Sequence, residues 1–137
     1  MTPAHPVVPS EPLARFILTR SHINWENSAR PRLRPEAFMP HPRIELSVFR
    51  IEGLDQNGVR EIGENVATQR GKRLVGRGDV TAGNIQSIGL RVEPKEPPPR
   101  HADVGGWPAL SGTPKEDKSR QKLIAQQIVE RARLVLA

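Results

Sequence analysis

The chain has 137 residues, of which 36% are hydrophobic and only 4% aromatic, and this composition fits one small domain with an aliphatic core. It contains no cysteine, which excludes disulfides and thiolate metal sites, and its first residues lack the pattern of a secretory signal. No segment has the apolar length of a membrane span, so we expect a cytoplasmic protein without membrane contacts.

The charge is basic and consists mostly of arginine. Lysine and arginine together number 21, against 15 acidic residues, and 16 of the 21 are arginine. The planar guanidinium binds phosphate or carboxylate oxygens in pairs, which the lysine ammonium cannot do. The composition therefore favours an anionic partner, either nucleic acid or an acidic protein surface. A basic surface that only maintains solubility is the alternative interpretation.

Prolines recur at every third residue from Pro3 to Pro12, which is the period of a polyproline II helix. We expect residues 1–14 to form an extended proline-rich arm and residues 15–137 to form one α+β domain. The β-prone segment from Arg15 to Thr19 predicts the first strand of that domain.

An irregular basic loop follows, over residues 21–35. It carries Arg30, Arg32 and Arg34 around two prolines. Alternation of apolar and polar residues from Arg43 to Ile51 then predicts the clearest strand of the chain.

A helix is predicted next, with Asp55 as its N-cap and Gly71 as its stop, because Val59, Ile62 and Val66 share one helical face.

The glycines at positions 76 and 78 predict a tight turn around Arg77, with Asp79 as the cap of a weak helix that reaches Ile88. The segment from Leu90 to Val92 predicts a third strand, which Pro94 ends.

The C-terminal helix has the strongest local signals. Thr113, Pro114 and Glu116 form a capping box with proline at the first helical position. We expect its apolar stripe to pack on the sheet, and this stripe consists of Ile124, Ala125, Ile128, Ala132 and Val135. The order of elements predicts an α+β fold, in which a small, mostly antiparallel sheet is packed by a middle helix and a long C-terminal helix.

The segment from Pro97 to Pro108 combines rigid residues with candidate catalytic ones. In a strand, His101 and Asp103 face the same side, where a histidine with a carboxylate suits general acid–base chemistry and Arg100 suits an anionic oxygen. If the first strand lies beside this segment, His22 becomes the second histidine of a metal-independent ribonuclease reaction. The alternative is a rigid connector whose polar side chains satisfy backbone groups.

Loop arginines near an aromatic residue are typical of proteins that bind single strands, because they combine phosphate contacts with base stacking. The four histidines lack the spacing of a metal site, so we expect no metal and no cofactor. The candidate stacking residues are Trp25 and Trp107, and the candidate anion-binding residues are Arg30, Arg32, Arg34, Arg43, Arg50, Arg73, Arg77 and Arg100.

Two segments of the chain resemble a group of uncharacterised small bacterial proteins. The first is Glu36-Ala37-Phe38-Met39-Pro40 leading into Leu46-Ser47-Val48-Phe49-Arg50, and the second is Pro99-Arg100-His101-Ala102-Asp103-Val104-Gly105. The resemblance implies no activity. It does imply that Ser47, Arg50 and His101 belong to one recurring constellation.

Three functions follow as hypotheses. The first is a small basic accessory protein that contacts nucleic acid or an acidic protein through its arginine-rich loops. The second is a metal-independent enzyme acting on a phosphodiester or nucleotide, with His101 as acid or base and Arg50, Arg77 or Arg100 as anion anchors. The third is a structural subunit of a larger complex, joined through the proline arm or the C-terminal helix.

Overall fold

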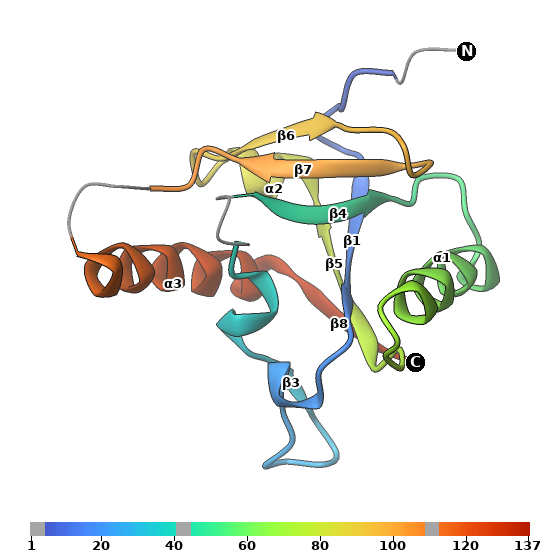
Figure 1. Cartoon of the computed structure of the whole chain (residues 1–137), viewed down its shortest axis with the longest axis horizontal. Coiled ribbons are helices and arrows are strands. Elements are labelled where there is room, and N and C mark those ends of the chain that lie inside the picture. The colour runs from blue at the N-terminus through green and yellow to red at the C-terminus, as the bar shows by residue number, and fades with distance from the viewer. Residues whose placement is uncertain (1–4, 41–44, 109–112) are drawn as a thin grey trace.

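The computed structural model describes residues 5–40, 45–108 and 113–137, which form a twisted antiparallel sheet with helices on both faces (Figure 1). The six strands lie in the order β6-β7-β4-β1-β5-β8. Their bounds are β1 Pro12–Ile17, β4 Leu46–Arg50, β5 Gly76–Thr81, β6 Arg91–Pro94, β7 His101–Gly105 and β8 Arg133–Leu136. The predicted α+β class, with its mostly antiparallel sheet, is confirmed.

The remaining elements are three α-helices, two short 3₁₀ helices and a small hairpin. These are α1 Gln56–Gln69, α2 Ala82–Gln86, α3 Pro114–Arg131, η1 Arg20–His22, η2 Pro35–Phe38, and the paired strands β2 Ile23–Asn24 and β3 Arg32–Leu33. The predicted middle helix and long C-terminal helix are both present, as α1 and α3. Among the residues that the structure describes, no helix is both long and apolar enough to cross a membrane.

Both long helices begin at the predicted caps. The Asp55 carboxylate accepts a hydrogen bond from the Gly58 amide at 2.7 Å, and the reciprocal contacts of Thr113 and Glu116 complete a capping box. The helix α3 ends at Arg131, however, and Val135 lies in β8 opposite Arg77 of β5. The predicted helical stripe was therefore too long, because pairing with β5 draws the last residues into the sheet.

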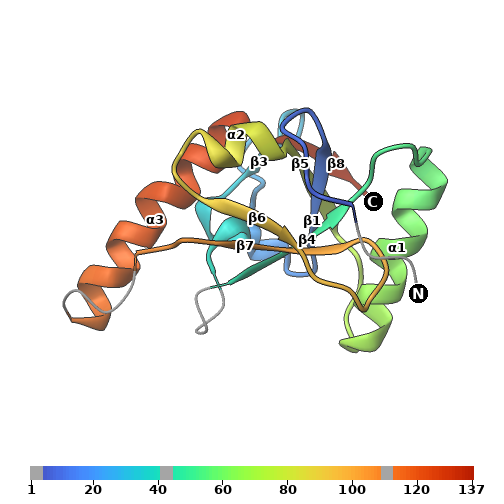
Figure 2. The same ribbon diagram turned by 90° about the horizontal axis from the view of Figure 1, so that it is seen from above.

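The two faces of the sheet bury separate cores. On one face, α2, α3 and η2 pack against the strands through residues such as Phe38, Ile85 and Ile128. On the other face, α1 covers a smaller cluster that includes Phe16 and Phe49 (Figure 2). The view from above shows α1 at the opposite end of the molecule from the start of α3.

The tight turn predicted at Gly76–Gly78 is wrong, because these residues form the start of β5, between β1 and β8. The two glycines allow close packing instead of a turn. A Cβ atom on Gly78 would lie 2.7 Å from the Phe38 ring, and one on Gly76 would lie 2.8 Å from the Val135 carbonyl. The predicted cap at Asp79 is also wrong, since the Thr81 side chain caps α2 by accepting from the Asn84 amide.

The proline-rich segment is attached to the sheet rather than separate from it. Glu11 is buried and forms a two-point ion pair with the Arg50 guanidinium, which also donates to the carbonyls of His5 and Pro6. The strand β1 begins at Pro12, so the boundary predicted at residue 14 lies within a strand.

A second arginine, Arg15, holds the sheet where two of its strands separate. The strands β1 and β4 pair through only two residues of β1, Leu13 and Ala14. Immediately beyond, Arg15 donates through Nε to the Ala37 carbonyl and through Nη1 to the Ser47 carbonyl, each at 3.0 Å. Burial, together with the nearby charge of Arg70, lowers the pKa of Arg15 to about 10.

Replacing Gly78 with alanine is expected to destabilise the fold by about 1–3 kcal/mol, because the added methyl group overpacks the Phe38 ring. Urea unfolding followed by tryptophan fluorescence measures the change. The control is Gly105→Ala, also in a strand, where the nearest atom to an added Cβ is a flexible Arg91 nitrogen at 3.7 Å. Equal stabilities of the two variants would contradict the packing argument.

Candidate functional site

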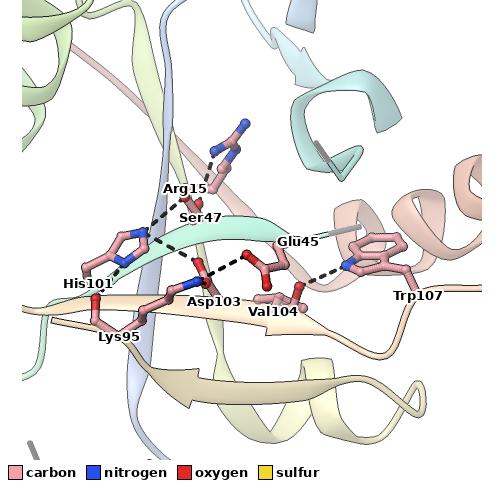
Figure 3. Close-up of polar contacts among 8 residues, drawn as sticks. All are labelled: Arg15, Glu45, Ser47, Lys95, His101, Asp103, Val104 and Trp107. Carbon is pink, nitrogen blue, oxygen red and sulfur yellow. Dashed lines mark hydrogen bonds and ion pairs between the residues drawn. The ribbon is translucent and has the colours of Figure 1, made fainter. Parts of the chain in front are cut away.

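A polar cluster on β4 and β7 is centred on His101 (Figure 3). The ring nitrogen Nδ1 lies 2.8 Å from the Lys95 carbonyl oxygen, and Nε2 lies 3.0 Å from Ser47 Oγ. Because a carbonyl can only accept, these contacts assign the proton of the neutral ring to Nδ1. Nε2 is then the acceptor, and the Ser47 hydroxyl donates to it.

Asp103 and Lys95 complete the cluster. The Asp103 carboxylate lies 3.6 Å from His101 Nε2 and 3.1 Å from Lys95 Nζ, and Lys95 also reaches Glu45 at 3.4 Å. The hydrogen bond and charge of Asp103, and then those of Glu45, raise the pKa of Lys95. The structure thus brings His101 and Asp103 together, as their spacing predicted. Two carboxylates against one ammonium make the cluster a poor site for an anion.

The structure places the other predicted catalytic residue, His22, in η1, where it makes no hydrogen bond, ion pair or ring contact with His101 among the described residues. Burial is the main reason why the pKa of His22 is lowered. The charges of Arg15 and Lys72 act in the same direction, and Glu36 opposes them.

A basic groove of about 470 Å³ lies near the ends of β1 and β8, and it is lined by Arg20, Trp25 and Arg73 with a floor of aliphatic residues. The Arg20 guanidinium lies 4.4 Å from the centroid of the Trp25 ring, which is a cation–π contact. The indole N–H donates to the Arg20 carbonyl at 2.9 Å and so fixes the ring. No acidic side chain lines this groove.

The hairpin arginines Arg30, Arg32 and Arg34 are all exposed, on or beside the β2–β3 hairpin that projects from the sheet (Figure 1). Trp25 directly follows β2, so the hairpin and the basic groove belong to one end of the molecule. None of the three forms an ion pair with a carboxylate in the described part of the chain.

The other predicted anion-binding arginines have different surroundings. Arg50 is occupied by Glu11, and Arg100 donates to the carbonyls of Arg50 and Glu52 from a left-handed backbone conformation, φ 68°. Arg77 is buried and bonded to Asp79 and Gln56. Arg43 lies outside the described residues.

The two candidate stacking residues, Trp107 and Trp25, differ in how accessible their rings are to a ligand. Trp107 is only 5% exposed and donates its indole N–H to the Val104 carbonyl. The stacking role predicted for Trp107 does not fit this position, because a ligand cannot reach a ring inside the core. Trp25 remains the candidate stacking residue.

Sequence reasoning did not identify Arg20 or Lys95 as members of a site. An arginine five residues before a tryptophan gives no helical or strand periodicity, so only the turn of η1 brings Arg20 onto the ring. Ser47 entered the prediction only through a resemblance, and the structure places it against His101 while Arg50 faces Glu11.

Comparison of the chain with protein-family models, with curated proteins and with solved structures finds no match. The described residues also contain no group of three or more histidine or acidic side chains placed to hold a metal ion.

The lowered pKa of His22 predicts that stability depends on pH. The unfolded chain binds a proton at His22 near pH 6.5, whereas the folded protein binds it only at lower pH. The free energy of unfolding should therefore fall as the pH drops below about 6.5 and level off below the folded-state pKa.

Urea unfolding between pH 5 and pH 8 tests this, with His22→Asn expected to reduce the slope in the lower half of that range. An NMR titration of the His22 ring provides the independent check. A midpoint at or above 6.5 would show that burial does not act on His22 as described.

Proposed function

We propose that the protein is a small accessory module that binds single-stranded nucleic acid through the basic groove and the hairpin arginines. The observation that carries this proposal is the position of the Arg20 guanidinium on the Trp25 ring, inside a groove that also contains Arg73. Guanidinium groups contact phosphates, and an indole offers a stacking surface to any base.

The lining of the groove favours nucleic acid over an acidic protein surface. An acidic surface would engage the arginines but would leave the Trp25 ring and the aliphatic floor at Leu18 and Val75 without a function. A single strand presents both kinds of group in alternation, since each charged phosphate is followed by an apolar base face. The free hairpin arginines extend the positive surface beyond the groove.

Binding of a fluorescently labelled single-stranded oligonucleotide is expected to weaken steeply with salt, as measured by anisotropy. Replacing Arg30, Arg32 and Arg34 together with alanine should lower the salt slope by about 2, because each phosphate contact on a single strand contributes about 0.7. Trp25→Leu should weaken binding by about 1–3 kcal/mol at every salt concentration, through loss of stacking.

The charge-matched control removes three exposed cations from α3, namely Lys115, Lys118 and Arg131. This variant should keep the wild-type slope. Affinity independent of salt, or an equal loss in the control, would refute the proposal. If polyglutamate competes as well as the oligonucleotide does, the partner is an acidic protein instead.

One contact favours a second candidate function, a metal-independent enzyme that cleaves RNA, although the Asp103 and Glu45 carboxylates oppose a bound phosphate and make such cleavage slow. His101 Nε2 is held as a proton acceptor by the Nδ1 contact with Lys95, which is the state a general base requires. In this reaction the 2′-hydroxyl replaces the Ser47 hydroxyl and gives its proton to Nε2 while its oxygen attacks phosphorus. The bond from phosphorus to the 5′-oxygen breaks, and water supplies the proton to that oxygen.

This candidate predicts a slow release of strands ending in 2′,3′-cyclic phosphate, which is measured by electrophoresis of a labelled RNA. His101→Asn should abolish the cleavage, while Ser47→Ala should retain it because Ser47 takes no part in the chemistry. Equal rates for the wild-type protein and His101→Asn would exclude His101 as the base.

A further inference from the structure

A smaller hollow, here called the arginine pocket, lies next to the basic groove. It has a volume of about 160 Å³ and is lined by Gln56, Asn57, Arg60 and Arg77 together with residues of β8. Leu74 and Leu136 line both hollows, so one wall separates the arginine pocket from the groove that contains Trp25. A ligand in the groove therefore has the pocket as its neighbour.

Arg77 supplies an unused donor in this pocket. Its side chain is only 9% exposed, with Nε bonded to Asp79 and Nη2 bonded to Gln56. The third nitrogen, Nη1, makes no hydrogen bond to the described residues. Among those residues, every fully buried side-chain nitrogen or oxygen has a hydrogen-bond partner. Nη1 is therefore not fully buried and is accessible to a small extent. Asp79 offsets the charge of Arg77, so Nη1 offers an anion a rigidly held hydrogen-bond donor rather than a free positive charge.

A second cation, Arg60, also lines the pocket. Arg60 is 60% exposed and is paired only loosely with Glu64, at 3.7 Å. Gln56 and Asn57 form the first turn of α1, where the positive end of the helix dipole adds to the attraction for an anion. Two guanidinium groups, one fixed and one mobile, thus converge on a small space with the helix start beside them.

We propose that the arginine pocket binds the terminal phosphate of a nucleic-acid strand whose neighbouring base lies in the basic groove, an inference that rests on the proposed function. A terminal phosphomonoester carries a charge of about −1.5 to −2 at neutral pH, more than the single charge of an internal phosphodiester. The pocket is bounded by α1, β5 and β8, so it suits a group at which the strand ends. An internal phosphate needs room for the chain on both sides.

The test compares three oligonucleotides of one sequence, carrying a 5′-phosphate, a 3′-phosphate or hydroxyl groups at both ends. One of the phosphorylated strands should bind about tenfold more tightly than the hydroxyl strand, the effect of a charge-assisted hydrogen bond. The 137-residue chain is used without a tag after Ala137, because Ala137 lines both hollows. The preference should decline below about pH 6, where the phosphate loses its second charge.

Two variants separate the pocket from the groove. Arg60→Ala, at an exposed position, should remove most of the preference for a phosphorylated end. Trp25→Leu should weaken the binding of all three oligonucleotides alike and leave that preference unchanged. Equal affinity for the three strands, or a preference that survives both Arg60→Ala and Arg77→Lys, overturns this inference while the proposed function stands. If no strand binds, both are overturned.

Discussion

The guanidinium of Arg15 makes the contacts on which the shape of the sheet depends. After Ala14, β1 and β4 separate, and the backbone carbonyls of Ser47 and Ala37 receive hydrogen bonds from Arg15. A buried carbonyl without a donor costs about 1–3 kcal/mol, so one side chain avoids that cost at two positions. It also ties η2 to the central strands, and η2 carries the fully buried Phe38 into the larger core.

The separation of β1 from β4 also sets the surroundings of the polar cluster. Ser47 is held on its carbonyl side by Arg15 and on its hydroxyl side by His101, so the position of the His101 ring depends on a backbone arrangement two strands away. The arginines accordingly divide into two groups. Arg15, Arg50 and Arg77 hold parts of the fold together through hydrogen bonds and ion pairs, with one nitrogen of Arg77 left for the arginine pocket, whereas Arg73 and the hairpin arginines leave their charge on the surface.

Local signals in the sequence were sufficient for the helices and the fold class. Asp55 and Thr113 cap α1 and α3 through contacts within three residues, so their patterns survive any change elsewhere in the fold. The strand β5 could not be predicted, because glycines that permit close packing have the same sequence pattern as glycines that form turns. The hydrogen bond from Ser47 to His101 could not be predicted either, because these residues are 54 positions apart and only the register of β4 and β7 brings them together.

The strand order has a consequence for how the molecule folds. In the six-stranded sheet, β6 and β7 are the only neighbours that are also consecutive in the described chain, while β5 pairs with β1 and β8 across long stretches of sequence. Sheets dominated by such distant pairs fold slowly, because the chain loses the entropy of loop closure before the stabilising contacts form. The wall shared by the two hollows is built from Leu74 and Leu136, so it forms only when β8 docks on β5. A folding intermediate that lacks β8 would carry the basic residues of the protein but would have neither the groove nor the arginine pocket to bind a nucleic-acid strand.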